Sequence, residues 1–225
     1  MKFLNDQSFR KDDVSIEILN DVVFSNFHIF KVTVIMSYPK IVLVGETNVG
    51  KTSLSVRYRT SQFSEESPAT IGAANILLPV HLENETVTLD LWDTAGQERY
   101  RSLTPMYFQG CIIAIFVYDI SKLQTFSSLD TFLSLLQQKA PENCAIVVVG
   151  NKSDMDIDRE VSIPRAEAYS QKIGALFYME TSAKNGTGVE ELFTRVAEVA
   201  RDSHRQKNDI SLSSKENESN QKQCC

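Results

Sequence analysis

The chain has 225 residues, of which 42% are apolar, and it carries a formal net charge of −6. This length suits one domain with tails, and the apolar content is sufficient for a sizeable core. The acidic balance argues against nucleic acid as the main partner, because proteins that bind a duplex usually present a basic face. No run of about eighteen uncharged apolar residues occurs, so the sequence predicts no membrane-spanning helix.

Residues 1–36 are the least regular part of the sequence. The stretch 14–36 is largely apolar, but charged residues in and just before it interrupt the pattern, and no small-residue cleavage site follows, so it does not fit a signal peptide. We expect residues 1–36 to be an N-terminal extension that is either disordered or an artefact of the gene model, with Met36 as the natural start. The alternative is an amphipathic arm that contacts a membrane.

From Lys40 onward, apolar runs alternate with loops and helix-compatible segments. Sequential strands of this kind predict an α/β fold with helices on both faces of a mostly parallel, six-stranded sheet. Residues 76–82 and 87–92, joined across 83–85, predict an antiparallel hairpin that gives the sheet one antiparallel edge strand. In such sheets, ligands bind at the carboxyl ends of the strands. The other predicted strands are residues 41–44, 112–118, 145–149 and 176–179.

Residues 45–52, GETNVGKT, follow the first of these strands and match the phosphate-loop spacing GxxxxGK[ST]. The glycines allow consecutive backbone N–H groups to turn toward a polyphosphate, and the following helix adds its positive N-terminal end. Lys51 would reach the β- and γ-phosphates, and Thr52 would give its hydroxyl to Mg²⁺. The alternative is a glycine-containing turn that only packs.

Residues 93–97, DTAGQ, come directly after the strand that ends at Trp92. The carboxylate of Asp93 can hold Mg²⁺ through a water molecule, and Gly96 can bring its N–H close to a γ-phosphate because it has no side chain. Gln97 would then orient the attacking water. The alternative is a turn that only closes the strand.

Residues 151–154, NKSD, and 181–184, TSAK, follow the last two predicted strands in the same way. The carboxylate of Asp154 can accept hydrogen bonds from the N1–H and the exocyclic amine of guanine, which adenine does not offer together. A site of this kind rejects the wrong base, because its buried polar groups would be left unpaired. The N–H of Ala183 could meet the guanine O6. Each tetrapeptide is common in loops, but their order after these strands favours a guanine-nucleotide site.

With these motifs in this order, residues from about 37 to 202 resemble the Ras superfamily of small GTPases, and within it the Rab family. The Rab features are Trp92 and residues 99–104 (RYRSLT) and 116–121 (FVYDIS), and residues 70–74 (TIGAA) and 102–107 (SLTPMY) are most similar to the early-endosomal branch. The resemblance implies a P-loop NTPase small G domain over residues 37–203. It also implies a protein that binds GTP or GDP with Mg²⁺, hydrolyses GTP slowly and recruits effectors to vesicle or endosomal membranes in the GTP state.

The resemblance also assigns roles to individual residues. Thr70 resembles the threonine that binds Mg²⁺ and senses the γ-phosphate, and Phe63 the aromatic residue that covers guanine. Read from spacing alone, Thr70 is a capping or turn residue and Phe63 an ordinary packing residue. The implied catalytic residues are Gln97, Lys51 and Thr70, and the implied metal ligands are Thr52, Thr70 and Asp93. The other implied nucleotide contacts are Gly45, Asn48, Val49, Gly50, Ser53, Gly96, Asn151, Lys152, Asp154, Ser182, Ala183 and Lys184.

The resemblance implies that effectors bind a surface formed by Ile71, Gly72, Asn75, Trp92 and Tyr107. The family usually carries an aromatic residue where Asn75 stands, so we expect effectors of the early-endosomal branch to bind this chain more weakly. Other implied partners are an exchange factor, an activating protein, a GDP-dissociation inhibitor and a prenylation escort protein, acting on a monomer.

Residues 204–225 are polar and are expected to form a flexible tail. The tail ends in Cys224 and Cys225, which do not form a CaaX box. The resemblance implies geranylgeranylation of both cysteines, and two lipid chains give stable membrane anchoring. The protein is then expected on the cytoplasmic face of early endosomes, with a cytosolic pool when GDP is bound. The alternative is a chance pair of exposed thiols.

Two other functions compete with a GTP-hydrolysing switch. The first is a binding module that loads GTP but barely hydrolyses it. The second is another P-loop enzyme, such as a nucleotide kinase. Asp154 and the lack of a recognisable lid for a second substrate argue against the kinase.

Overall fold

The computed structural model describes residues 14–17, 33–36, 38–66, 68–97 and 103–203. The chain divides into two compact units, Met1–Tyr38 and Pro39–Cys225. In the first unit, β1 (Val14–Glu17) pairs antiparallel with β2 (Thr33–Met36). Sequence analysis did not predict this hairpin, although both short strands are rich in the β-branched residues that favour extended backbone. The other expectations for residues 1–36 lie outside the described residues.

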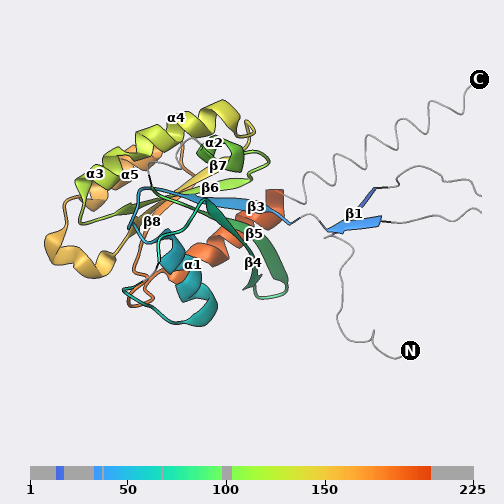
Figure 1. Ribbon diagram of the computed structural model, residues 1–225, viewed down its shortest axis with the longest axis horizontal. Coiled ribbons are helices and arrows are strands. Elements are labelled where there is room, and N and C mark those ends of the chain that lie inside the picture. Colours follow the sequence, from blue (N-terminus) through green and yellow to red (C-terminus); the bar gives the residue numbers. More distant parts are fainter. Residues whose placement is uncertain (1–13, 18–32, 37, 67, 98–102, 204–225) are drawn as a thin grey trace, which may run out of the picture. The chain divides into compact units, whose positions relative to one another are not determined.

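The second unit is built on a six-stranded sheet with the strand order β4-β5-β3-β6-β7-β8 (Figure 1). β4 runs antiparallel to β5, and every other neighbouring pair is parallel. This arrangement confirms the predicted α/β fold with one antiparallel edge strand. The strands are β3 (Lys40–Val44), β4 (Ala73–His81), β5 (Thr86–Thr94), β6 (Ile113–Asp119), β7 (Ala145–Asn151) and β8 (Phe177–Thr181).

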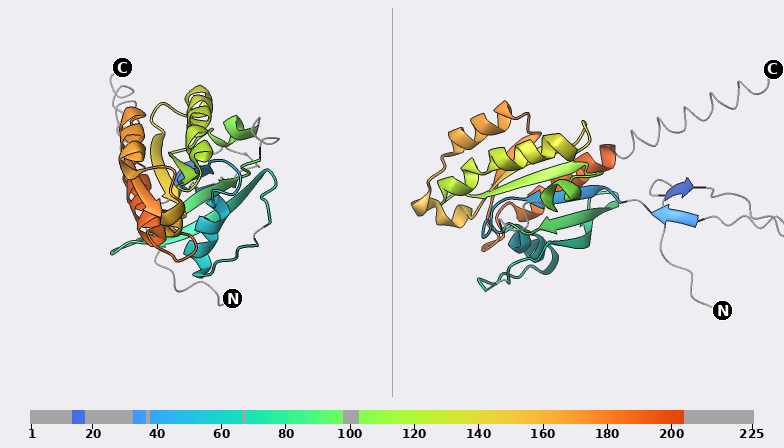
Figure 2. Two further views of the ribbon diagram at one scale, coloured as in Figure 1. Left: turned by 90° about the vertical axis from the view of Figure 1, so that its left-hand side faces the viewer. Right: turned by 45° about the horizontal axis from the view of Figure 1, so that its top comes forward.

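Helices cover both faces of this sheet (Figures 1 and 2). α1 and a helix over residues 189–203 lie on one face, and α3, α4 and α5 lie on the other. None of the described helices has the length and apolar content needed to cross a bilayer. The remaining elements are α1 (Lys51–Thr60), α2 (Thr104–Tyr107), α3 (Leu123–Ser127), α4 (Leu129–Lys139), the 3₁₀ helix η3 (Ser153–Asp158) and α5 (Ile163–Lys172).

Both faces of the sheet are buried because successive side chains in a strand point to opposite sides. In β3, Ile41 belongs to the same buried cluster as Leu54 of α1. Its neighbour Val42 belongs to the cluster on the other face, with Phe132 of α4. This two-sided burial explains why the central strands read as continuous apolar runs rather than as alternating patterns.

The edge strand β4 is longer than predicted. It begins at Ala73 rather than at residue 76, because its pairing with β5 continues through Asn75 opposite Trp92 to Ala73 opposite Thr94. The added residues lack an apolar alternation, so their pattern does not indicate a strand. Pro79 also lies in β4, and an edge strand tolerates it because its nitrogen can face away from the neighbouring strand.

The parallel strands bring the predicted loops to one edge of the sheet. β3, β5, β7 and β8 run in the same direction, and each ends where one of the loop motifs begins. The motifs at residues 45–52, 93–97, 151–154 and 181–184 therefore lie at the carboxyl ends of neighbouring strands. This is the position at which open α/β sheets bind ligands.

Candidate functional site

The loop between β3 and α1 depends on two glycines. Gly45 and Gly50 have φ angles of 152° and 94°, which side chains disfavour. A Cβ at Gly45 would lie 2.1 Å from the carbonyl oxygen of Val117, and one at Gly50 would lie 2.3 Å from Nδ2 of Asn151. Any larger residue would therefore push the loop away from the ends of β6 and β7.

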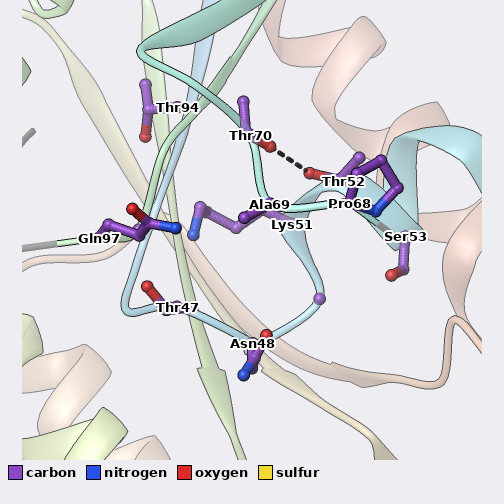
Figure 3. A pocket seen from close by; sticks show the side chains of 12 residues that line it. Thr47, Asn48, Lys51, Thr52, Ser53, Pro68, Ala69, Thr70, Thr94 and Gln97 are labelled. Atoms are coloured by element: carbon purple, nitrogen blue, oxygen red, sulfur yellow. Dashed lines mark hydrogen bonds between the residues drawn. The ribbon is translucent and has the colours of Figure 1, made fainter. Parts of the chain in front are cut away.

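This loop borders a pocket of about 80 Å³, drawn in Figure 3. The pocket brings together predicted residues from the phosphate loop, the segment before β4 and the segment after β5. Its lining also includes Thr47, Pro68, Ala69 and Thr94, which are not in the predicted set. The lining residues are Thr47, Asn48, Gly50, Lys51, Thr52, Ser53, Pro68, Ala69, Thr70, Thr94, Gly96 and Gln97.

Lys51 supplies a buried cation at the centre of the loop. Its Nζ donates hydrogen bonds to the carbonyl oxygens of Gly45 and Glu46, both at 2.9 Å. Burial lowers the pKa of Lys51 to about 8, although the charges of Asp93 and Glu46 oppose this shift. The amine is therefore mainly protonated at neutral pH. Figure 3 shows the amide of Gln97 pointing toward this amino group.

The predicted metal ligands Thr52, Thr70 and Asp93 meet beside Lys51. Thr52 Oγ1 donates to Asp93 Oδ2 at 2.6 Å and lies 2.9 Å from Thr70 Oγ1 (Figure 3). Burial raises the pKa of Asp93, although the hydrogen bond from Thr52 and the charge of Lys51 lower it. Among the described residues, Asp93 Oδ1 is buried without a hydrogen-bond partner. An unpaired carboxylate oxygen beside two hydroxyls is a set of hard oxygen ligands that fits Mg²⁺.

Gly96 lies directly against the phosphate loop. A Cβ at this position would come within 2.5 Å of the backbone of Glu46 and Thr47. Only glycine allows this approach, which holds the next residue, Gln97, at the border of the pocket. Thr47 borders the same pocket as Gln97.

Asn151 connects the phosphate loop to the loop after β8. Its Nδ2 donates to the carbonyl oxygen of Val49 at 2.8 Å. Its Oδ1 accepts from the Thr181 hydroxyl and from the Ala183 N–H, both at 3.2 Å. The side chain is buried, so the amide joins three backbone segments in a site with little water. Asn151, which is predicted to contact the nucleotide, thus also links the phosphate loop to the loop after β8.

The predicted base-selecting residue Asp154 is exposed and accepts a hydrogen bond from the Ser182 hydroxyl. Ser182 Oγ in turn accepts from the Asn185 N–H at 3.2 Å. This chain of hydrogen bonds sets the orientation of the Asp154 carboxylate relative to the loop that carries Ala183. Asp154, Ser182, Ala183 and Lys184 do not line the pocket around Lys51.

Lys152 depends on a residue that sequence analysis missed. Its φ is 67°, and its Nζ lies 2.7 Å from Oδ2 of the buried Asp119. Burial alone would raise the pKa of Asp119, but hydrogen bonds from Lys152 and Ser121 outweigh it and lower the pKa. Asp119 follows a predicted strand directly, so the same rule that selected Asp93 could have found it.

Arg57 of α1 is a second residue that sequence analysis missed. Its guanidinium contacts the loop after β8 and lies 5.9 Å from the ring centre of Phe63, the predicted guanine cover. Phe63 itself is half-buried against the core. Arg57 could not be found from the sequence, because its side chain binds backbone carbonyls, at Ser61 and, more than 120 residues away, at Ala183 and Lys184.

The predicted effector surface forms one patch around β4, β5 and α2. The rings of Trp92 and Tyr107 lie 5.8 Å apart, and Ile71 is 79% exposed. Asn75 donates to one carboxylate oxygen of Asp90, and Trp92 Nε1 donates to the other at 3.0 Å. Gly72 lies beside Tyr107, since a Cβ at Gly72 would be 3.7 Å from the tyrosine hydroxyl.

Two sets of predicted residues lie outside the described residues. The first is part of the motif at 99–104, of which residues 99–102 are not described. The second is the tail at 204–225 with Cys224 and Cys225.

Comparison with known proteins gives consistent matches over the second unit. A model of the Ras family matches residues 40–202. The chain is 43% identical over 157 residues to the putative ras-related protein Rab-5B of Dictyostelium discoideum, which covers 70% of this chain and 72% of that protein. It is 42% identical over 158 residues to the Ras-related protein Rab5 of Nicotiana tabacum, with 70% and 78% covered.

The links made by Asn151 predict a loss of stability without any ligand. Asn151→Ala leaves the buried Ala183 N–H and the Val49 carbonyl without their partners, so we expect the free energy of unfolding to fall by about 2–3 kcal/mol. The measurement is denaturant unfolding of the nucleotide-free protein. Asn185→Ala, at an exposed loop position, is the control and should cost less than about 1 kcal/mol. Equal losses in the two variants would contradict the role given to Asn151.

Proposed function

Since the chain belongs to the Ras family, and within it to the Rab small GTPases of the Rab5 branch, we propose that it binds GTP or GDP with Mg²⁺ and recruits effectors to endosomal membranes. Members of this family hydrolyse GTP to GDP and phosphate, and the chain is a GTPase. One observation carries the proposal for the site: Lys51, Thr52 and Thr70 border one pocket, and Asp93 accepts a hydrogen bond from Thr52 directly beside it. Phosphoryl transfer requires a cation that binds the phosphate oxygens and, next to it, residues that bind Mg²⁺.

The proposed reaction depends on positioning and charge neutralisation more than on a strong base. Lys51 exchanges its two loop carbonyls for the β- and γ-phosphate oxygens of GTP. Thr52, Thr70 and Asp93 would hold Mg²⁺, and the ion would neutralise part of the phosphate charge. Gln97 orients the attacking water through its amide. No arginine among the described residues lines the pocket around Lys51, so intrinsic hydrolysis is slow and an activating protein accelerates it by a factor on the order of 10³–10⁵.

Selection of guanine follows from the loops after β7 and β8. Asp154 accepts hydrogen bonds from the N1–H and the exocyclic amine of the base, and Ser182 holds its carboxylate in place. The Ala183 N–H faces O6. Adenine leaves these groups unpaired, and this loss produces the preference for guanine.

The switch depends on two residues that face the γ-phosphate from the two ends of one hairpin. Thr70 lies shortly before β4, and Gly96 lies shortly after β5, and these strands pair with each other. When the γ-phosphate leaves, both contacts are lost and the adjoining loops loosen. The effector surface includes Ile71 and Trp92 on the same hairpin, so partners distinguish the GTP state from the GDP state.

We propose the same division of the chain as the sequence suggested: a small G domain over residues 37–203, followed by a tail over residues 204–225. Geranylgeranyl groups on Cys224 and Cys225 attach the tail to the cytoplasmic face of early endosomes. The charges of the tail are mixed, so they add little attraction to anionic lipids and the lipid chains carry the attachment. A GDP-dissociation inhibitor extracts the GDP form into the cytosol.

Gln97→Leu tests the proposed water-positioning residue. We expect the single-turnover rate of GTP hydrolysis to fall by at least about tenfold while GTP affinity changes by less than about twofold, because the amide acts on water rather than on ground-state binding. The exposed residue Gln109, changed to leucine, is the matched control. If the unchanged chain hydrolyses GTP no faster than the Gln97→Leu variant, the protein would instead be a module that acts by GTP binding alone.

Asn75→Phe tests the departure in the effector surface. The substitution removes the hydrogen bond to Asp90 and restores an aromatic anchor beside Trp92. We expect the GTP-loaded variant to bind an effector of the Rab5 branch about tenfold more tightly, because aromatic side chains dominate such interfaces. The measurement is titration calorimetry with GTP-loaded and GDP-loaded protein, and Gln138→Phe on α4 is the control. Unchanged affinity would show that Asn75 does not limit binding.

Replacement of Cys224 and Cys225 by serine tests the membrane anchor. The tagged parent should mark early endocytic vesicles, and the serine variant should be diffuse, because it lacks both lipid attachment sites. Fluorescence microscopy in the protein's own cells, with fractionation into membrane and soluble pools, measures this. A parent on another compartment would refute the endosomal assignment, and a diffuse parent would refute the anchor.

A further inference from the structure

Arg57 joins three parts of the molecule that are far apart in sequence. Its Nε donates to the carbonyl oxygen of Ala183 at 2.6 Å, and one terminal nitrogen donates to the carbonyl oxygen of Lys184. The other terminal nitrogen donates to the carbonyl oxygen of Ser61 at 2.5 Å. The guanidinium also lies 5.9 Å from the ring centre of Phe63. All these contacts come from one side chain on the last turns of α1.

These contacts hold Ala183 from two sides. Its carbonyl oxygen binds Arg57, and its N–H binds Oδ1 of Asn151 at 3.2 Å. Ala183 is only 3% exposed, so both hydrogen bonds form where water cannot readily replace them. The carbonyl lies in the peptide group between Ala183 and Lys184, and the N–H lies in the group between Ser182 and Ala183. Removal of Arg57 would therefore free the 183–184 peptide and would loosen the adjoining Ala183 N–H through the shared Cα.

Ser61 is held in a similar way. Its N–H donates to the carbonyl oxygen of Arg57 at 2.9 Å, and its own carbonyl accepts from the Arg57 side chain. Ser61 has a φ of 57°, a conformation that a non-glycine residue adopts at a cost. The segment that leads to Phe63 therefore leaves α1 in a direction that Arg57 helps to fix.

We propose that Arg57 is a positioning residue for the guanine base. It holds the loop 182–184 and the segment 61–63 against the end of α1, and it thereby limits the rate at which the nucleotide dissociates. The inference rests on the proposed function, because it requires that the Ala183 N–H faces the guanine O6. α1 begins at Lys51 and Thr52 on the phosphate side and carries Arg57 about 9 Å further along its axis. One rigid helix thus connects the phosphate side of the site with the base side.

Other charged groups nearby do not replace this contact. Lys184 and Glu65 form an ion pair at 3.2 Å, but both side chains are more than half exposed, and such pairs contribute little. Arg59 is two residues further along α1 and is exposed, with the same charge and helix environment. It is therefore a matched control for the loss of an arginine from this helix.

The first experiment measures dissociation of fluorescent GDP during a chase with unlabelled GDP. We expect Arg57→Ala to release GDP at least tenfold faster than the unchanged chain, and Arg59→Ala to release it within twofold of the unchanged rate. Arg57→Lys keeps the charge but has one terminal nitrogen for three carbonyl oxygens, so its rate should fall between the two. If Arg57→Ala does not fold, Arg57→Lys and Arg57→Gln carry the same comparison with the Arg59→Ala control.

The second experiment separates positioning of the base from a general loosening of the protein. In Arg57→Ala, release of inosine diphosphate, which keeps O6, should accelerate as much as release of GDP. Release of 2-aminopurine riboside diphosphate, which lacks O6, should accelerate less than release of GDP, because it feels only the loosening of the segment 61–63 and not that of the Ala183 N–H. The single-turnover hydrolysis rate of preloaded GTP should also stay within twofold, because Arg57 does not contact the pocket around Lys51.

Three outcomes would count against these proposals in different ways. Equal acceleration of all three nucleotides would overturn the positioning role and leave Arg57 a general structural residue. Unchanged GDP release in Arg57→Ala would also overturn it, while leaving guanine-nucleotide binding intact. Failure of the unchanged chain to bind GDP would overturn the proposed function itself, and the positioning role with it.

Discussion

The site depends on one constraint: parallel strands that end at the same edge of the sheet bring four separate loops together there. The loops share little sequence and no regular structure, so side-chain to backbone hydrogen bonds hold them together. The buried amide of Asn151 does most of this by joining the carbonyl of Val49 to the loop that contains Thr181 and Ala183. A single side chain of fixed length thereby sets the distance between the phosphate side and the base side.

Much of the fold and of the site could be predicted because both depend on local sequence. The buried strands are continuous apolar runs, and the motif loops follow them directly, so their order gave the α/β class and the edge at which the loops meet. Two features were missed for physical reasons. The start of β4 at Ala73 is set by pairing with β5 rather than by its own apolar pattern. Arg57 acts on backbone carbonyls, which leave no trace in the identity of the residues that carry them.

Local sequence also cannot distinguish the two buried carboxylates Asp93 and Asp119. Asp93 is buried with one oxygen unpaired among the described residues, and burial raises its pKa. Asp119 is equally buried, but its bonds to Lys152 and Ser121 lower its pKa. Both aspartates end a strand, and sequence position alone cannot distinguish them. Their partners differ: Lys152 Nζ lies 2.7 Å from Asp119, whereas one oxygen of Asp93 has no hydrogen-bond partner among the described residues.

Pro79 has a consequence for how this sheet can meet other chains. β4 is the edge strand next to β5, so its outer side offers backbone donors and acceptors to an incoming strand. The nitrogen of Pro79 has no hydrogen to donate, and a foreign strand that pairs along β4 loses a bond at that position. Continuous strand addition is therefore confined to the part of β4 before Pro79. The proline protects the far half of the edge from aggregation, while the half near Asn75 stays open to a partner's backbone.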